Sequence, residues 1–216
     1  MPLLEFARGP AFRFAVLVFL AGLAWRLLHL LLARRKIDLS EPRQGGVRGG
    51  LATIFTRLVH PPQFRERTRN GTLIAYTMHI GLAIVVFGSA PHIILIESVA
   101  GVAWAPLPPV VVHLAAGITL AALFAALARR LGHPVLRLLS NFDDYFSWVV
   151  TAMPLVTGLL ATAHIGLRYE TLLALHILSF DAFLIWFPFG KLMHAVIVFG
   201  SRYTTGAAFA RRGARA

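Results

Sequence analysis

Two histidines bracket a mostly apolar stretch of the chain, His176-Ile-Leu-Ser-Phe-Asp-Ala-Phe-Leu-Ile-Trp-Phe-Pro-Phe-Gly-Lys-Leu-Met-His194. Eighteen positions separate them, which is about five whole turns if the stretch forms one uninterrupted helix. Both imidazoles then lie on one face of that helix, roughly 27 Å apart along its axis. A hydrocarbon layer is about 30 Å thick, so the two side chains are expected near its opposite surfaces. Because ionisable groups are costly in lipid, this placement indicates a functional role.

The composition of the 216-residue chain is that of an integral membrane protein. Hydrophobic residues make up 57% of it, above the share of a typical soluble domain. The absence of cysteine excludes cysteine-ligated iron–sulfur clusters, thiol catalysis and disulfides within this polypeptide. The formal net charge of +12 lies mainly between the apolar segments. That distribution favours an anionic lipid bilayer, and not nucleic acid, as the counterpart of the charge.

Five apolar segments are long enough to cross a bilayer, and they predict an all-α membrane bundle. The segments are about Ala11–Ala33, Thr72–Ile96, Pro109–Ala128, Tyr145–Ile165 and Glu170–Phe199. The chain is short enough for these spans to form a single transmembrane domain over residues 1–216.

Positive charge is distributed unequally between the two sides of the predicted spans. The connection 34–70 is strongly basic, and more arginines lie in the connection after the third span and in the C-terminal tail. The connections at about 97–108 and 166–169 carry only Arg168. The positive-inside rule therefore predicts that the N-terminus lies outside and the C-terminus in the cytoplasm. We expect the protein to lie in the inner (cytoplasmic) membrane.

This orientation predicts that four histidines pair by depth. His79 and His194 are expected toward the cytoplasm, and His92 and His176 toward the exterior. Neutral imidazole is a good ligand for iron, and two axial histidines on facing helices can hold a haem in a bundle core. Because the chain has no Cys-x-x-Cys-His motif, we expect b-type haem that is bound non-covalently. The alternative for each histidine is a hydrogen-bonded packing residue.

Two of the spans resemble a known family in detail. The string Phe187-Pro188-Phe189-Gly190-Lys191-Leu192-Met193-His194, with His176 upstream, resembles the ligand helix of the gamma subunit of respiratory nitrate reductase. The string His-Ile-Gly-Leu-Ala-Ile-Val-Val-Phe-Gly that begins at His79 resembles the other ligand helix of that family. The resemblance implies two b haems, the inner one held by His79 and His194 and the outer one held on one side by His176. It also implies a subunit that oxidises quinol and passes electrons to an attached iron–sulfur and catalytic module, and so is not a complete enzyme alone.

The chain departs from the family pattern at the second ligand of the outer haem, where it has Ser89. The nearest histidine, His92, lies three residues later, which is roughly 4.5 Å further along a helix and turned by about 60°. Pro91 can bend the segment enough to correct this offset. His92 is the favoured outer ligand. Substitution by His113 or His164, or loss of the outer haem, are the alternatives.

Five further residues are candidates for parts of the cofactor and quinol sites. Lys191 and Arg26 lie near the inner boundary, where their charges can pair with haem propionates or reach out to the interface. Glu97 and His113 flank the outer connection and are candidates for a quinol pocket, with ordinary interfacial polar residues as the alternative. Asp181 lies mid-membrane, where a carboxyl is either functional or hydrogen-bonded to a neighbouring helix.

The sequence identifies the family of this subunit more clearly than it identifies the catalytic partner. The basic first connection is more similar to cytochromes b of heterodisulfide-reductase-like, sulfite-reduction and membrane-bound hydrogenase complexes. We expect electrons from quinol oxidised at the outer side to pass to a cytoplasmic iron–sulfur subunit that docks on this basic surface. The alternatives are a haem-free or mono-haem membrane anchor, and a cytochrome that passes electrons from a hydrogenase or heterodisulfide-reductase-like module to quinone. A transporter is disfavoured because no inverted repeat is visible.

Overall fold

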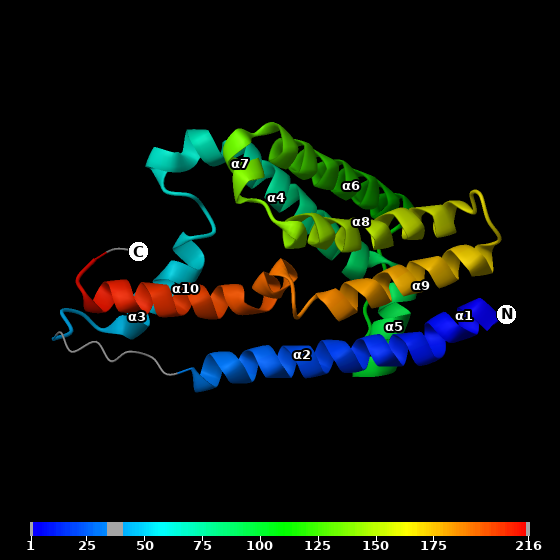
Figure 1. Ribbon diagram of the computed structural model, residues 1–216, viewed down its shortest axis with the longest axis horizontal. Helices are drawn as coiled ribbons and strands as arrows, with labels where there is room; N and C mark the ends of the chain where they lie inside the picture. The colour runs from blue at the N-terminus through cyan, green and yellow to red at the C-terminus, as the bar shows by residue number, and fades with distance from the viewer. Residues whose placement is uncertain (1, 34–40, 215–216) are drawn as a thin grey trace. The chain divides into compact units, whose positions relative to one another are not determined.

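A computed structural model describes residues 2–33 and 41–214, which are mainly helical with no β-strand among them (Figure 1). Five helical segments are long and apolar enough to cross a membrane: Pro2–Leu32, Pro62–Gly88, Pro109–Gly132, Phe142–Ala163 and Tyr169–Trp186. The predicted all-α class is therefore confirmed, and the number of helical segments that are long and apolar enough to span a membrane is the predicted five. Arg34, Arg35 and Lys36, at the start of the predicted basic connection, lie outside the described residues.

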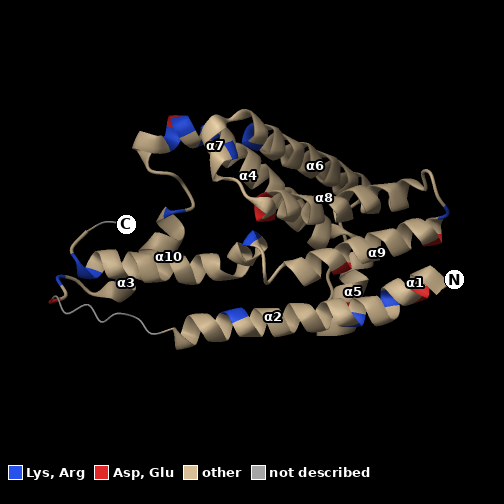
Figure 2. Ribbon diagram, viewed as in Figure 1, with Lys and Arg blue, Asp and Glu red and all other residues tan. Residues whose placement is uncertain are grey.

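The chain divides into two compact units, and each is described by itself. The first unit comprises Met1–Phe19 and Asn70–Phe187, and the second comprises Leu20–Arg69 and Pro188–Ala216. Charged residues are sparse along the long helices of the first unit and gather near their ends, as expected for helices that span a membrane (Figure 2).

The first unit is built mainly from long helices. Its elements are α1 (Pro2–Phe6), the π-helical segment η1 (Ala7–Ala11), the first part of α2 (Phe12–Leu32), most of α4 (Pro62–Gly88), α5 (Ala90–Ala100), α6 (Pro109–Gly132), α7 (Pro134–Leu139), α8 (Phe142–Ala163) and α9 (Tyr169–Trp186). Helix α8 packs against both α6 and α9, and α9 also packs against α1 and η1. Helices α5, α8 and α9 carry the residues of the candidate site.

Small residues and one indole bring α4, α6 and α8 together. The hydrophobic core contains Leu123 of α6 and Leu155 of α8, with side chains of α4 packed against it. Gly81 of α4 has no side chain, and a Cβ there would collide with the buried Thr119 of α6. Trp148 Nε1 of α8 donates a hydrogen bond to the Leu123 carbonyl at 2.7 Å. Close backbone approach of this kind is how membrane helices associate without a hydrophobic driving force.

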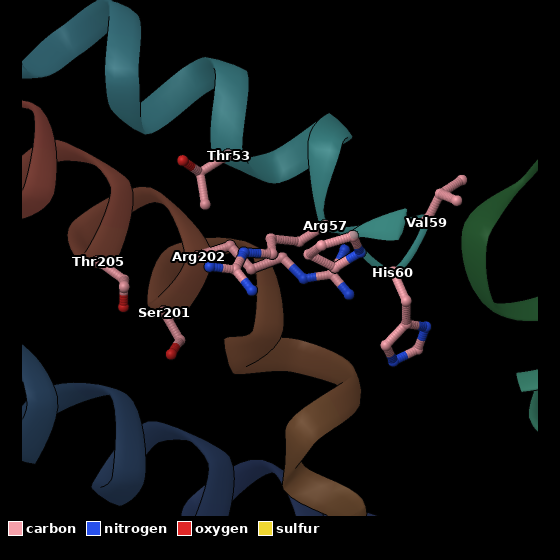
Figure 3. Close-up of a pocket in the computed structure, with 8 residues that line it drawn as sticks. Thr53, Arg57, Val59, His60, Ser201, Arg202 and Thr205 are labelled. Carbon is pink, nitrogen blue, oxygen red and sulfur yellow. The ribbon is translucent and has the colours of Figure 1, made fainter. Parts of the chain in front are cut away.

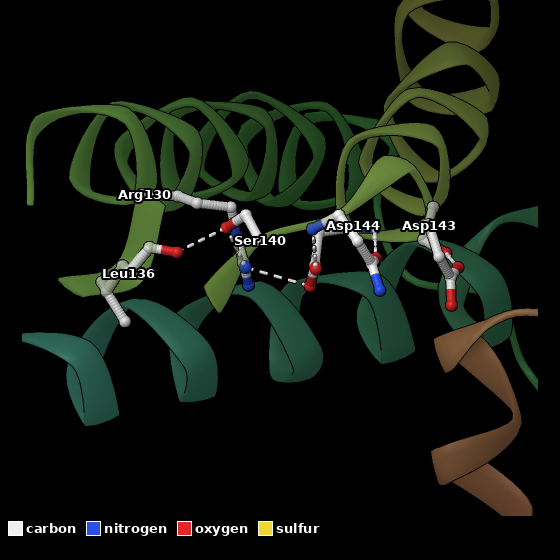
Figure 4. Close-up of polar contacts among 7 residues, drawn as sticks. Arg130, Leu136, Ser140, Asp143 and Asp144 are labelled. Carbon is white, nitrogen blue, oxygen red and sulfur yellow. Dashed lines mark hydrogen bonds and ion pairs between the residues drawn. The ribbon is translucent and has the colours of Figure 1, made fainter. Parts of the chain in front are cut away.

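A polar cluster joins α6, α7 and α8 (Figure 4). Arg130 Nη1 forms an ion pair with Asp144 Oδ1 at 2.9 Å and donates to Ser140 Oγ at 2.9 Å. Asn141 and Asp144 form a capping box at the start of α8. Asp143 accepts hydrogen bonds from Ser147 Oγ and from Trp186 Nε1 at the end of α9. The acidic residues of this turn therefore have structural roles.

The second unit contains a helix that the sequence does not predict. The basic connection includes α3 (Gly46–Thr56), which packs against α10 (His194–Arg211). A Cβ on Gly49 would collide with Ala210, and one on Gly206 would collide with Thr53. The glycines of α3 disfavour a helix by local propensity, but they allow α10 to approach the backbone of α3 closely.

The fifth predicted span is not one helix, so the expectation that His176 and His194 lie on a single helical face is wrong. Helix α9 ends at Trp186, and a 3₁₀ turn, η2 (Lys191–Met193), precedes α10, which begins at His194. Pro188 lacks the N–H that would continue the helix, and Gly190 has an extended backbone with φ −96° and ψ −176°. The two histidines therefore belong to different helices and to different units.

Candidate functional site

A break in the second predicted span determines where His92 lies. Helix α4 ends at Gly88, Ser89 is extended with φ −77° and ψ 127°, and α5 begins at Ala90. Pro91 occupies the first turn of α5, where its missing N–H has no intrahelical partner to lose. The offset of about 60° expected for one continuous helix does not apply, because the ladder of hydrogen bonds is interrupted between Gly88 and His92.

The end of α4 holds His92 in place. A helix terminus leaves carbonyl groups without intrahelical partners. Here the Val85 carbonyl accepts a hydrogen bond from His92 Nδ1 at 3.1 Å, and the Phe87 carbonyl accepts one from Trp104 Nε1 at 2.6 Å. The Gly88 carbonyl accepts one from the Leu107 N–H at 2.9 Å. Since a carbonyl only accepts, Nδ1 of His92 carries the proton and Nε2 has the lone pair.

Helix α8 fixes the imidazole of His176 in the same way. His176 Nδ1 lies 3.1 Å from the Pro154 carbonyl and 3.3 Å from Thr157 Oγ1. Thr157 Oγ1 is also 3.0 Å from Ser179 Oγ, which donates to the His176 carbonyl at 2.7 Å. A Cβ on Gly158 would lie 3.1 Å from Cε1 of the imidazole. The carbonyl again requires the proton on Nδ1, so Nε2 of His176 also has its lone pair available.

The two histidines face one another across α5 and α9. Their ring centres are 6.0 Å apart, and the ring planes are 14° from parallel. Both side chains are half-buried within the first unit. Each Nδ1 is engaged by a backbone carbonyl. In the neutral form of such a ring the lone pair is on Nε2, which is the nitrogen that could ligate a metal.

His79 and His194 share one feature with this pair. His79 Nδ1 lies 2.7 Å from the Ala75 carbonyl, and His194 Nδ1 lies 2.7 Å from the Lys191 carbonyl. Both side chains are exposed. His79 belongs to the first unit and His194 to the second, so the structure describes each histidine separately.

The other candidate residues are distributed over several elements. Lys191 in η2 and Arg26 in α2 are exposed and belong to the second unit. Glu97 on α5 and His113 on α6 are exposed, and their side chains make no hydrogen bond within the described part of the chain. His164 ends α8 in the left-handed conformation, with φ 56°, and stacks on Tyr169 at 5.0 Å. Of these predicted site residues, the structure thus places His92 beside His176.

Comparison with known proteins finds a relative that matches nearly the whole chain. A protein of Nitratidesulfovibrio vulgaris (strain Hildenborough) is 31% identical over 217 residues, which cover 96% of this chain and 94% of the relative. The chain belongs to the same family as this protein. The printed name of this family member is "Protein", which states no ligand, activity or partner. No protein-family profile and no solved structure matches the chain.

The residues that surround His176 in this chain were not predicted from the sequence. Pro154, Thr157 and Gly158 come from α8, and no spacing rule connects them to a histidine on α9. Ser179 is the one local signal, because it follows His176 by three positions on the same helix. Asp181 is buried at 4% exposure, and neither carboxyl oxygen has a hydrogen-bond partner among the described residues.

Proposed function

We propose that the protein is a b-type haem membrane subunit of a respiratory oxidoreductase complex. In this role it moves electrons between the quinone pool and a cytoplasmic iron–sulfur subunit, which passes them to or from a catalytic subunit. The observation that carries the proposal is the facing pair of His92 and His176, with both Nδ1 atoms hydrogen-bonded to backbone carbonyls.

The two rings lie close enough together to hold one group between them. A metal ion lies about 2.0–2.1 Å from an imidazole nitrogen that binds it, so two rings that would hold the same metal must lie within several ångströms of each other. The observed separation of the ring centres is 6.0 Å. Among the described residues, no group of three or more His, Cys, Asp or Glu could hold a metal ion. A haem suits this pair because its porphyrin supplies the remaining ligands and the bound iron transfers single electrons.

The surrounding residues would hold the ligands in position. Hydrogen bonds from Nδ1 to the Val85 and Pro154 carbonyls fix the tautomer and orientation of each ring and raise the basicity of Nε2. Thr157 adds a second contact to Nδ1 of His176. The family resemblance of the sequence supports a second haem, which would be held by His79 and His194 with propionate contacts from Lys191 and Arg26.

The proposed direction of transfer depends on orientation in the inner membrane. The distribution of basic residues supports an exterior N-terminus and a cytoplasmic C-terminus. Quinol would be oxidised near Glu97 and His113 at the outer side, and electrons would leave from the inner haem. Arg65, Arg67 and Arg69 are exposed on the first turns of α4 and would form part of the docking surface for an acidic iron–sulfur subunit.

A reduced-minus-oxidised optical spectrum of the purified full-length protein tests the proposal. We expect the bands of a low-spin b cytochrome, with about two haems per chain if both pairs are occupied. His176→Ala should remove one haem, whereas His133→Ala, in the exposed turn between α6 and α7, should leave the spectrum unchanged. A fully folded protein without haem absorbance, isolated from cells that make haem, would reject the cytochrome and favour a haem-free membrane anchor.

A further inference from the structure

A basic pocket of about 280 Å³ lies within the second unit, where the C-terminal end of α3 meets α10 (Figure 3). Its polar lining residues are Thr53, Arg57, His60, Ser201, Arg202 and Thr205. No acidic side chain lines it, and neither arginine forms an ion pair within the described residues. Two guanidinium charges therefore share one cavity without a carboxylate to balance them.

The helices position these groups from two sides. Arg57 is the residue that follows α3, and Arg202 reaches from α10 to donate from Nη1 to the Ile54 carbonyl at 3.3 Å. Ser201 and Thr205 lie one helical turn apart on α10, on either side of Arg202 in the sequence. The C-terminal carbonyls of α3 contribute only about half a negative charge, so the two arginines dominate the local potential.

The exposed apolar face of α3 indicates that the pocket lies at a membrane interface. Val47, Leu51 and Phe55 are four residues apart, lie on one face of the helix and are 64%, 52% and 69% exposed. The glycines of α3 occupy the opposite face, against α10. An apolar face next to basic residues is typical of a helix that lies in the membrane interface. Val59, which is 60% exposed, continues this apolar surface to the pocket itself.

We propose that this pocket binds the phosphate group of an anionic membrane lipid. Arginine pairs match phosphate oxygens in geometry and charge, and the hydroxyl groups of Ser201 and Thr205 add neutral donors. The volume is just below the about 300 Å³ at which sites for small molecules begin, so a headgroup phosphate fits and a whole lipid does not. The exposed apolar side chains of α3 favour a lipid over free phosphate, because acyl chains lie next to a lipid phosphate. The proposal does not depend on the haem assignment.

Native mass spectrometry of the full-length protein, after exchange into phosphatidylglycerol or phosphatidylcholine, tests this site. We expect one phosphatidylglycerol to be retained per chain, with no equivalent retention of phosphatidylcholine. The double variant Arg57→Gln/Arg202→Gln should lower retention at least about tenfold, since each charge-assisted hydrogen bond lost is worth about a factor of ten or more. The matched control is Arg48→Gln/Arg211→Gln, which removes the same charge from α3 and α10 at positions outside the pocket and should keep the lipid.

Three results would overturn the proposal. Equal loss of lipid in both double variants means that diffuse charge, and not the pocket, retains it. Binding of inorganic phosphate that matches phosphatidylglycerol in strength and in dependence on Arg57 and Arg202 identifies a free-phosphate site. Failure of the wild-type protein to prefer phosphatidylglycerol, while an acidic peptide binds through the two arginines, identifies a protein partner. Circular dichroism and gel filtration establish that each variant is folded before retention is compared.

Discussion

The imidazole rings of His92 and His176 face each other with their centres 6.0 Å apart and their planes 14° from parallel. Neither ring is held by its own helix alone. The carbonyl that fixes His92 belongs to Val85 of α4, and the one that fixes His176 belongs to Pro154 of α8. Four helices therefore set the geometry of the pair before any ligand binds, which is the arrangement that a preorganised site needs.

The first prediction separates His92 from the other histidines that could act as the outer ligand. His92→Ala should remove one haem per chain, because it deletes one of the two imidazoles that would hold that haem. His113→Ala and His164→Ala should retain it, since His164 stacks on Tyr169 and His113 makes no ring contact in the described part of the chain. Haem content from pyridine haemochrome spectra provides the measurement. Loss of haem in His113→Ala but not in His92→Ala would refute the assignment.

Gly158 provides a steric test of the same site. A Cβ on Gly158 would lie 3.1 Å from Cε1 of His176, so Gly158→Ala should shift the imidazole by a few tenths of an ångström. We expect weaker haem retention and a shifted reduction potential. Gly117→Ala is the matched control, because nothing lies within 4 Å of a Cβ at that position of α6. If the two alanine variants have equal potentials and haem contents, the position of His176 does not depend on Gly158.

The sequence predicts the five spans because the length of an apolar run directly reports the thickness of the bilayer. The cap at Asn141 depends on equally local information, since the side chains that satisfy a helix N-terminus lie within one turn of it. The helix breaks are different. Whether Pro91 bends a helix or begins a new one depends on partners for the freed carbonyls, and here Trp104 and Leu107 supply two of them from the following connection. That information is tertiary, so the direction in which His92 points does not follow from spacing.

Helix α3 is a case in which local helix propensity alone leads to the wrong prediction. Its glycines make an isolated helix unfavourable by about 1 kcal/mol each relative to alanine, so local propensity argues for a loop. The same glycines permit close packing on α10, where a Cβ on Gly49 would collide with Ala210. Packing therefore overrides propensity in this unit, and the basic pocket beside α3 has no counterpart in any sequence motif.

Thr157 tests the contribution of the groups around the ligand. Thr157→Val keeps the shape of the side chain but removes the hydroxyl that lies 3.3 Å from His176 Nδ1 and 3.0 Å from Ser179 Oγ. Loss of an outer hydrogen bond of this kind typically weakens metal affinity by about 10–100-fold. Haem dissociation into apomyoglobin measures the effect. Thr162→Val is the control, because Thr162 Oγ1 bonds only to carbonyls of its own helix; an equal effect in both variants would exclude a specific role for Thr157.

The last prediction concerns Asp181, which is 4% exposed and has no hydrogen-bond partner for either carboxyl oxygen among the described residues. A buried polar group without a partner costs about 1–3 kcal/mol, so Asp181→Leu should raise the thermal unfolding temperature. Asp143→Leu should lower it, because Asp143 Oδ1 accepts hydrogen bonds from Ser147 and Trp186. Differential scanning fluorimetry in detergent compares the two variants.

If Asp181→Leu becomes more stable and still transfers electrons from quinol at the wild-type rate, the carboxyl is a packing residue. A more stable protein with slower quinol oxidation indicates that the unsatisfied carboxyl is retained for proton transfer. A less stable Asp181→Leu protein would show that the carboxyl has a bonding partner in the membrane.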